Sequence, residues 1–200
     1  MRGITFGNHD DNCGVSNARQ MAIYASHKGF VGGCPRSPED PGTFSLQLQD
    51  SRGKRDIFNL YVIDSGGKGD DGVYQPVTKE RIDWFRQERE RLFALNGAYL
   101  PSIVFQHIPL PEYYDVLRRV EKGTKGAVEA FYNHEGEYYV LPEEAIRRGD
   151  FMLESPAAPD KNTGELDALT EKGDVLGVWV GHDHINSFSI EFRDHRRCHA

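Results

Sequence analysis

The stretch Val178-Trp179-Val180-Gly181-His182-Asp183-His184-Ile185-Asn186 joins an apolar run to a glycine and two histidines. The apolar residues are typical of a buried strand, and Gly181 lets the backbone turn tightly where the strand ends. A loop that leaves a rigid strand end can aim its side chains at a common point. Two histidines that flank one aspartate can each offer a neutral imidazole to a cation. The stretch therefore predicts a strand followed by a metal-binding loop; two surface histidines in a turn are the alternative.

Two other stretches repeat this plan. Ile4-Thr5-Phe6-Gly7-Asn8-His9-Asp10-Asp11 and Ile103-Val104-Phe105-Gln106-His107-Ile108-Pro109-Leu110-Pro111 each place polar, ligand-type residues where a short apolar run ends. A lone histidine after a strand is by default a core residue that hydrogen-bonds within the protein. Because His107 belongs to an ordered set of three such stretches, we interpret it as a metal ligand.

The remaining chain alternates between strand-like and helical patterns, which predicts an α/β layered domain. We expect strands near residues 3–6, 44–48, 57–63, 101–107, 174–180 and 187–192, and helices near 17–28, 79–95, 111–123 and 164–169. We expect surface loops at 29–42 and 64–72. The second loop is rich in Gly and Asp but lacks the Lys-Ser/Thr of a phosphate-binding P-loop.

Composition limits the possible partners and compartments. The chain has 200 residues, which suit one domain, and a formal net charge of -7. Nucleic-acid binding needs a basic face, so we expect no nucleic-acid partner, and no apolar run is long enough to predict a membrane partner. Cys13, Cys34 and Cys198 make no even framework, so we expect reduced thiols, with a Cys13–Cys34 disulfide as the alternative in a secreted chain. No signal peptide begins at Met1, which favours a cytoplasmic location.

The order of the three motifs resembles the calcineurin-like metallophosphoesterase family. Gly7-Asn8-His9-Asp10 comes first, a histidine after a strand follows at position 107, and Gly181-His182-Asp183-His184 comes last. The stretches Leu60-Tyr61-Val62-Ile63-Asp64-Ser65-Gly66 and His107-Ile108-Pro109-Leu110-Pro111-Glu112-Tyr113 are similar to the purple-acid-phosphatase-like branch. The resemblance extends from Gly7 to about Phe188. It implies an α/β fold with a layered metallophosphatase β-sandwich flanked by helices.

The sequence departs from the family pattern at its beginning. The family normally carries Asp-x-His and then Gly-Asp-x-x-Asp upstream of Gly-Asn-His-Asp, and neither motif is present here. Gly69-Asp70-Asp71-Gly72 and Gly149-Asp150-Phe151-Met152 both lack the second aspartate. We therefore expect residues 1–200 to form a single, partial phosphoesterase domain that is incomplete on its N-terminal side, with a frayed tail at 193–200.

The resemblance implies the metal ligands. Asn8, through its carbonyl oxygen, His107 and His182 would bind one metal ion, and His184 would reach another. The complete family site holds two ions, whereas this chain would hold one or none, because the bridging aspartate is missing. Mixed nitrogen and oxygen ligands suit divalent or trivalent Fe, Zn or Mn.

The resemblance also implies two catalytic residues. His9 would contact the phosphate and could protonate the leaving oxygen. Asp10 would orient His9 through a hydrogen bond, as carboxylates do for imidazoles near metal sites.

These residues predict a phosphatase that hydrolyses phosphate monoesters of a small molecule or phosphopeptide. Two ions about 3.5–4 Å apart normally activate water in such sites, so we expect little or no turnover from this chain. A phosphodiesterase or nucleotide pyrophosphatase of the same fold is one alternative, and a non-catalytic remnant or interaction module is another. A partial domain should expose apolar strand edges, so we also expect possible self-association.

Overall fold

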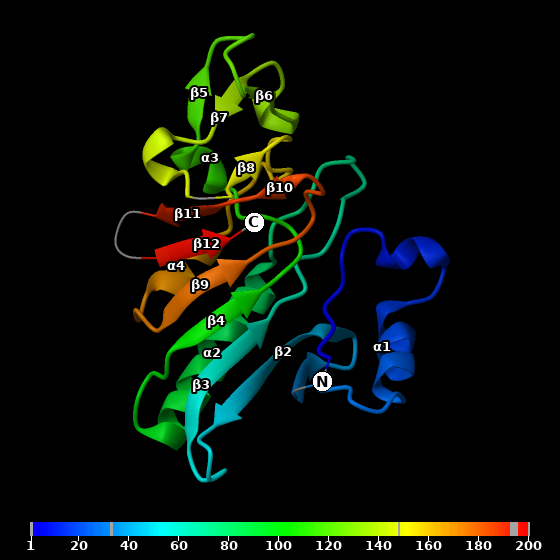
Figure 1. Cartoon of the computed structure of the whole chain (residues 1–200). Helices are drawn as coiled ribbons and strands as arrows, with labels where there is room; N and C mark the ends of the chain where they lie inside the picture. The colour runs from blue at the N-terminus through cyan, green and yellow to red at the C-terminus, as the bar shows by residue number, and fades with distance from the viewer. Residues whose placement is uncertain (1, 33, 148, 193–195, 200) are drawn as a thin grey trace.

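A computed structural model of the chain describes residues 2–32, 34–147, 149–192 and 196–199. Its main layer is a seven-stranded mixed sheet with the strand order β1-β2-β3-β4-β9-β12-β11 (Figure 1). Neighbours from β3 to β12 pair in parallel, whereas β1, β2 and β11 pair antiparallel with their neighbours. The strands are β1 Cys34–Ser37, β2 Asp40–Gln49, β3 Asp56–Val62, β4 Ser102–Phe105, β9 Val175–Trp179, β11 Ser189–Phe192 and β12 Arg196–His199.

The helix α2, Lys79–Asn96, covers one face of this sheet and lies behind it in Figure 1. It ends at Gly97, which adopts the left-handed conformation and donates its N–H to the Phe93 carbonyl at 2.8 Å. Its apolar stripe includes Phe85, whose ring meets that of Tyr61 in β3 edge-on at 4.8 Å. The main core therefore lies between α2 and the central strands.

Smaller elements surround the main sheet. A three-stranded sheet has the order β5-β7-β6, and a two-stranded sheet joins β10 to β8. Within the part of the chain that the structure describes, no helix is both long and apolar enough to span a bilayer. The elements outside the main sheet and α2 are α1 Asn17–Ala25, α3 Tyr113–Val116, α4 Glu165–Thr170, β5 Arg118–Val120, β6 Val128–Glu129, β7 Tyr138–Val140, β8 Phe151–Met152 and β10 Asn186–Ser187, with short 3-10 turns at Asp10–Cys13, Tyr132–His134 and Glu143–Ala145.

The α/β class is confirmed, since a mixed sheet is flanked by helices. The helix expected near 79–95 is present as α2, and the helix expected near 17–28 is α1. Ser16, a preferred N-cap residue type, caps α1, with its hydroxyl accepting the Arg19 N–H at 3.3 Å. The sequence features that predict these helices, caps and apolar spacing, lie within a few neighbouring residues.

The helix expected at 111–123 is wrong beyond its first turn. Only Tyr113–Val116 is helical, and Arg118–Val120 form strand β5, which pairs with β7. The apolar spacing fits a helix, but pairing with a distant strand satisfies the same backbone groups and overrides the local preference.

Two further expectations near the N-terminal end are corrected. The loop expected at 29–42 contains β1 and the start of β2, which form an antiparallel hairpin. The strand expected at 3–6 does not join the sheet; only Arg2 forms an isolated bridge, with Phe30. Phe6 is nevertheless buried, so this segment contributes a core side chain without a strand.

The frayed tail expected at 193–200 is also wrong in part. Residues 196–199 form β12, which lies between β9 and β11 and pairs with both. Residues 193–195 and 200 lie outside the described residues. Cys13 is exposed and free, so the alternative Cys13–Cys34 disulfide is not formed.

Candidate functional site

The carboxyl ends of three parallel strands form one edge of the molecule. β3, β4 and β9 end in register, with Phe105 opposite both Val62 and Trp179. Beyond these ends the Gly181 N–H donates to the His107 carbonyl at 3.1 Å, so the loops after β4 and β9 stay side by side. Ligands of open α/β sheets commonly bind at this edge.

Three ligand-type atoms converge at this edge. His107 Nε2 lies 2.8 Å from Asn8 Oδ1 and 3.2 Å from His182 Nδ1. The two imidazole rings meet at 72° with their centroids 5.0 Å apart. The structure therefore brings together Asn8, His107 and His182, which lie far apart along the chain.

Two glycines border the His107 ring at this approach. A Cβ atom at Gly7 would lie 2.9 Å from two ring atoms of His107, which is too close for a side chain. A Cβ atom at Gly181 would lie 3.4 Å from Nδ1 of the same ring. The His107 imidazole is therefore held between two loops, of which the one at Gly7 has no room for a side chain.

Both imidazoles in this cluster favour the neutral form. Burial lowers the pKa of His107, against the opposing charge of Asp10, and His184 and His9 lower it further. Burial also lowers the pKa of His182 to about 4, and neighbouring imidazoles act in the same direction. A neutral imidazole keeps a lone pair for a cation at neutral pH.

The hydrogen bond expected between Asp10 and His9 is not the one that the structure makes. Asp10 Oδ2 instead accepts the Gly7 N–H at 2.6 Å, and His9 Nδ1 pairs with Asn12 Nδ2 at 2.8 Å. The 3-10 turn Asp10–Cys13 brings a free backbone donor within reach of the carboxylate, and this local donor wins. Asn12, rather than Asp10, therefore orients the His9 ring.

His184 lies beside the cluster rather than within it. A cavity of about 220 Å³ is lined by four of the predicted site residues and by aromatic and acidic side chains. Its lining residues are Asn8, His9, Tyr74, Phe131, Tyr132, Glu154, Ala157, His182, Asp183 and His184. His9 and His184 are both exposed, and both border this cavity. The cavity is thus the space in which a ligand would meet the cluster.

Asp183 supports the loop between the two histidines. Its Oδ1 accepts the Ala157 N–H at 3.1 Å and thereby ties the loop after β9 to residues 153–157. Burial raises the pKa of Asp183 to about 7, against the opposing Ala157 hydrogen bond.

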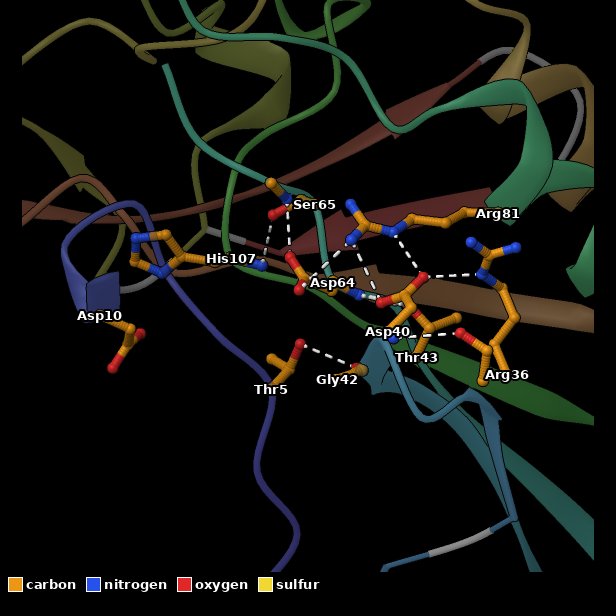
Figure 2. A network of polar contacts seen from close by, with 12 residues as sticks. Thr5, Asp10, Arg36, Asp40, Gly42, Thr43, Asp64, Ser65, Arg81 and His107 are labelled. Atoms are coloured by element: carbon orange, nitrogen blue, oxygen red, sulfur yellow. Dashed lines mark hydrogen bonds and ion pairs between the residues drawn. The ribbon is translucent and has the colours of Figure 1, made fainter. Parts of the chain in front are cut away.

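A buried ionic network lies directly behind the His107 loop (Figure 2). Ser65 Oγ accepts the backbone N–H groups of His107 at 3.2 Å and Ile108 at 2.9 Å. The adjacent Asp64 lies 3.4 Å from Arg81 Nη2 in the first turns of α2. The network therefore links the position of His107 to the start of the covering helix.

The pKa values of two buried carboxylates in this network are shifted in opposite directions. Asp40 accepts hydrogen bonds from Arg81 Nε at 2.9 Å and Arg36 Nε at 2.7 Å. Burial acts to raise the pKa of Asp40, but these hydrogen bonds outweigh it and hold the pKa below its ordinary value. For Asp64, burial prevails over the Arg81 charge, and its pKa is raised.

Tyr74 is a site residue that the sequence did not reveal. It lies in the loop between β3 and α2, lines the cavity, and accepts the Asn8 Nδ2 hydrogen bond at 3.2 Å. The available signal was a Gly- and Asp-rich segment that follows a central strand at the edge where the other motifs lie. Among the described residues, no group of three or more His, Cys, Asp and Glu side chains is placed to hold a metal ion. The convergent set has two such side chains, and its third member is an amide.

The fold and the order of its loops resemble those of a phosphoesterase, and comparison with known proteins supports this class. Two curated relatives, Probable inactive purple acid phosphatase 14 and Probable inactive purple acid phosphatase 29 of Arabidopsis thaliana, are each 27% identical to the chain over 174 residues. Each match covers 80% of this chain but only 37% and 38% of the relatives, so the chain spans just over a third of their length.

The similarity supports the resemblance to the purple-acid-phosphatase-like branch and a phosphatase-family origin. No family model matches the chain. No solved structure matches it at a significant level.

Proposed function

We propose that this chain binds one divalent metal ion through Asn8, His107 and His182 and holds a phosphate monoester beside it, as one part of a phosphatase site. The observation that carries this proposal is the convergence of the three side chains. Two ligands held about 2.1 Å from one ion lie about 3.0–3.4 Å apart at ordinary coordination angles. The separations of 2.8 and 3.2 Å within the cluster are close to that range.

Proton counting supports a cation at this place. Asn8 Oδ1 carries no proton, and a neutral imidazole has one nitrogen that accepts. Either a single proton on His107 Nε2 serves both Asn8 Oδ1 and His182 Nδ1, or His182 Nδ1 donates to His107 Nε2 and two lone pairs face each other at the Asn8 contact. A metal ion would satisfy all three lone pairs at once. The neutral state favoured by the buried imidazoles is also the state that binds metal.

His9 would act on the phosphate. Asn12 Nδ2 can only donate, so His9 Nδ1 accepts and the proton of the neutral ring resides on Nε2. That Nε2–H could donate to a phosphate oxygen in the cavity or protonate the leaving oxygen. A bound ion would polarise the phosphoryl group and lower the pKa of its water.

We expect binding with little or no turnover from this chain by itself. Within the described residues there is no acidic cluster that could hold a second ion beside His184. The names of both curated relatives describe those proteins as probable inactive, which supports the alternative of a non-catalytic, metal-binding remnant. In either case the substrate class would be a phosphorylated small molecule or phosphopeptide, since the net charge of -7 disfavours nucleic acid.

Metal titration tests the proposal. We expect isothermal titration with Mn²⁺ or Zn²⁺ to give one ion per chain, and His107→Ala and His182→Ala to lose at least ten-fold in affinity. His27→Ala is the matched control, because His27 is exposed and lies outside the cluster. Equal affinity in His107→Ala and wild type would contradict the proposal.

Turnover of p-nitrophenyl phosphate with added Mn²⁺ tests the second part. We expect rates close to the uncatalysed reaction. Robust turnover that His9→Ala abolishes would show instead that the chain is a complete catalyst.

A further inference from the structure

The loop between β3 and α2 folds back on itself and presents one aromatic residue to the site. The Gly69 N–H donates to the Val73 carbonyl at 2.9 Å, and the Gln75 N–H donates to the Gly67 carbonyl at 3.0 Å. These bonds make a short ribbon in which Lys68 and Tyr74 form a bridge. Tyr74 is buried, with only 8% of its surface exposed. The backbone of the ribbon therefore fixes where the Tyr74 side chain lies.

The Tyr74 hydroxyl satisfies one end of the Asn8 amide. Asn8 Nδ2 donates to it at 3.2 Å, while Asn8 Oδ1 faces His107 Nε2 at 2.8 Å. Only the oxygen end of an amide can bind a cation, so the nitrogen end needs an acceptor elsewhere. Tyr74 supplies that acceptor and so favours the orientation with the oxygen turned towards the histidines.

The Tyr74 ring also supports two strained residues. His182 and Tyr132 are the two non-glycine residues with positive φ, at 75° and 54°, in the described part of the chain. Such conformations cost about 1–3 kcal/mol each and persist where the surroundings hold them. The ring of Tyr74 meets the His182 ring edge-on at 4.5 Å and the Tyr132 ring edge-on at 5.7 Å. One aromatic side chain therefore buttresses both.

We propose that Tyr74 is a positioning residue that presets Asn8 Oδ1 and His182 Nδ1 for a metal ion. The hydroxyl acts on Asn8, and the ring acts on His182. This inference rests on the proposed metal binding by Asn8, His107 and His182. It extends that function to a residue from a fourth loop, which touches the ligands and not the ion.

Two substitutions separate the two actions. Tyr74→Phe removes the hydroxyl and keeps the ring, so the Asn8 amide loses its acceptor while the support of His182 remains. We expect the Co²⁺ affinity to fall about ten-fold, the lower end of the range for residues that orient metal ligands. Tyr74→Ala should lose more and should also change the visible absorption spectrum of bound Co²⁺, which reports coordination geometry.

Tyr99→Phe is the matched control, because it removes a hydroxyl that hydrogen-bonds Glu90 at 2.8 Å on another part of the molecule. A residue with only a structural role would lower thermal stability without changing the Co²⁺ affinity of the folded protein. A Tyr74→Phe affinity within two-fold of wild type would therefore overturn the inference and leave the metal site standing. Failure of the wild-type chain to bind Co²⁺ would overturn both. The Phe variant keeps the test decisive even if Tyr74→Ala does not fold.

Discussion

Both faces of the seven-stranded sheet are apolar, but α2 covers only one of them. On the covered face, Tyr61 and Val104 are fully buried and Val178 is 2% exposed. On the opposite face, Phe105 is 37% exposed and Leu48 is 46% exposed. The same strands therefore contribute to a closed core on one side and to an open apolar surface on the other.

The difference shows that an apolar strand sequence does not determine whether both faces of the strand are covered by other elements. Residues 103–105 are apolar on both sides of β4, as in strands that are covered on both faces. The face opposite α2 is buried mainly beside β2, where Phe6 and Phe44 are each 1% exposed. The Phe105 and Trp179 rings contact each other at 5.8 Å on the part that stays open. An apolar surface of this kind is typical of interaction sites.

The largest expected effect compares two phenylalanines on opposite faces. Phe85→Ala should lower the free energy of unfolding by about 3–5 kcal/mol, because it empties a closed core. Phe105→Ala should lower it by about 1 kcal/mol, since a third of that side chain already meets solvent. Urea denaturation of both variants measures the difference. Equal losses would show that the two faces are equally closed.

An effect of comparable size concerns an acid on the covered side. Burial, with a contribution from Glu112, raises the pKa of Glu165 to about 8, and a hydrogen bond with Gln106 opposes the shift only in part. The folded state therefore binds one more proton than the unfolded state between about pH 4.5 and 8. Stability should fall as the pH rises through this window, by up to about 1.4 kcal/mol per unit.

Glu165→Gln removes this titration, so its pH dependence should be flatter than that of the wild type, with the largest gain near pH 8. Denaturant unfolding from pH 5 to pH 8 measures both slopes. Glu144→Gln, at an exposed position, should retain the wild-type slope. A wild-type protein as stable at pH 8 as at pH 5 would contradict the prediction.

The smallest expected effect on stability concerns the open face itself. We predict that this face supports self-association, so Leu48→Glu combined with Phe105→Glu should shift the mass in solution towards the monomer. Stability should change by about 1 kcal/mol or less, as for other partly exposed positions. Light scattering over a range of concentrations measures the mass. Leu95→Glu, on the 67%-exposed tip of α2, is the control. A wild-type protein that stays monomeric at high concentration would argue against the prediction.

Local signals in the sequence predicted α2 and the starts of α1 and α3, because caps and apolar stripes depend on near neighbours. The sequence could not predict β5 in place of the helix at 111–123, since that strand exists only through its partner β7. The residues that approach one another in the site were predicted in the case of Asn8, His107 and His182, because each follows an apolar run and their order resembles the phosphoesterase family. Tyr74 was not, because its place depends on a ribbon whose register no local pattern fixes.

The position of β12 has a consequence for how the chain acquires its structure during synthesis. β11 joins the sheet through β12, which follows it in the sequence and pairs in parallel with β9. A ribosome adds about 5–20 residues per second, so β9 waits with an unpaired edge until residues 196–199 have emerged. We therefore expect the nascent chain to be most open to aggregation and chaperone capture between the emergence of β9 and that of residues 196–199, and a stop codon placed after β11 to prolong that vulnerable state.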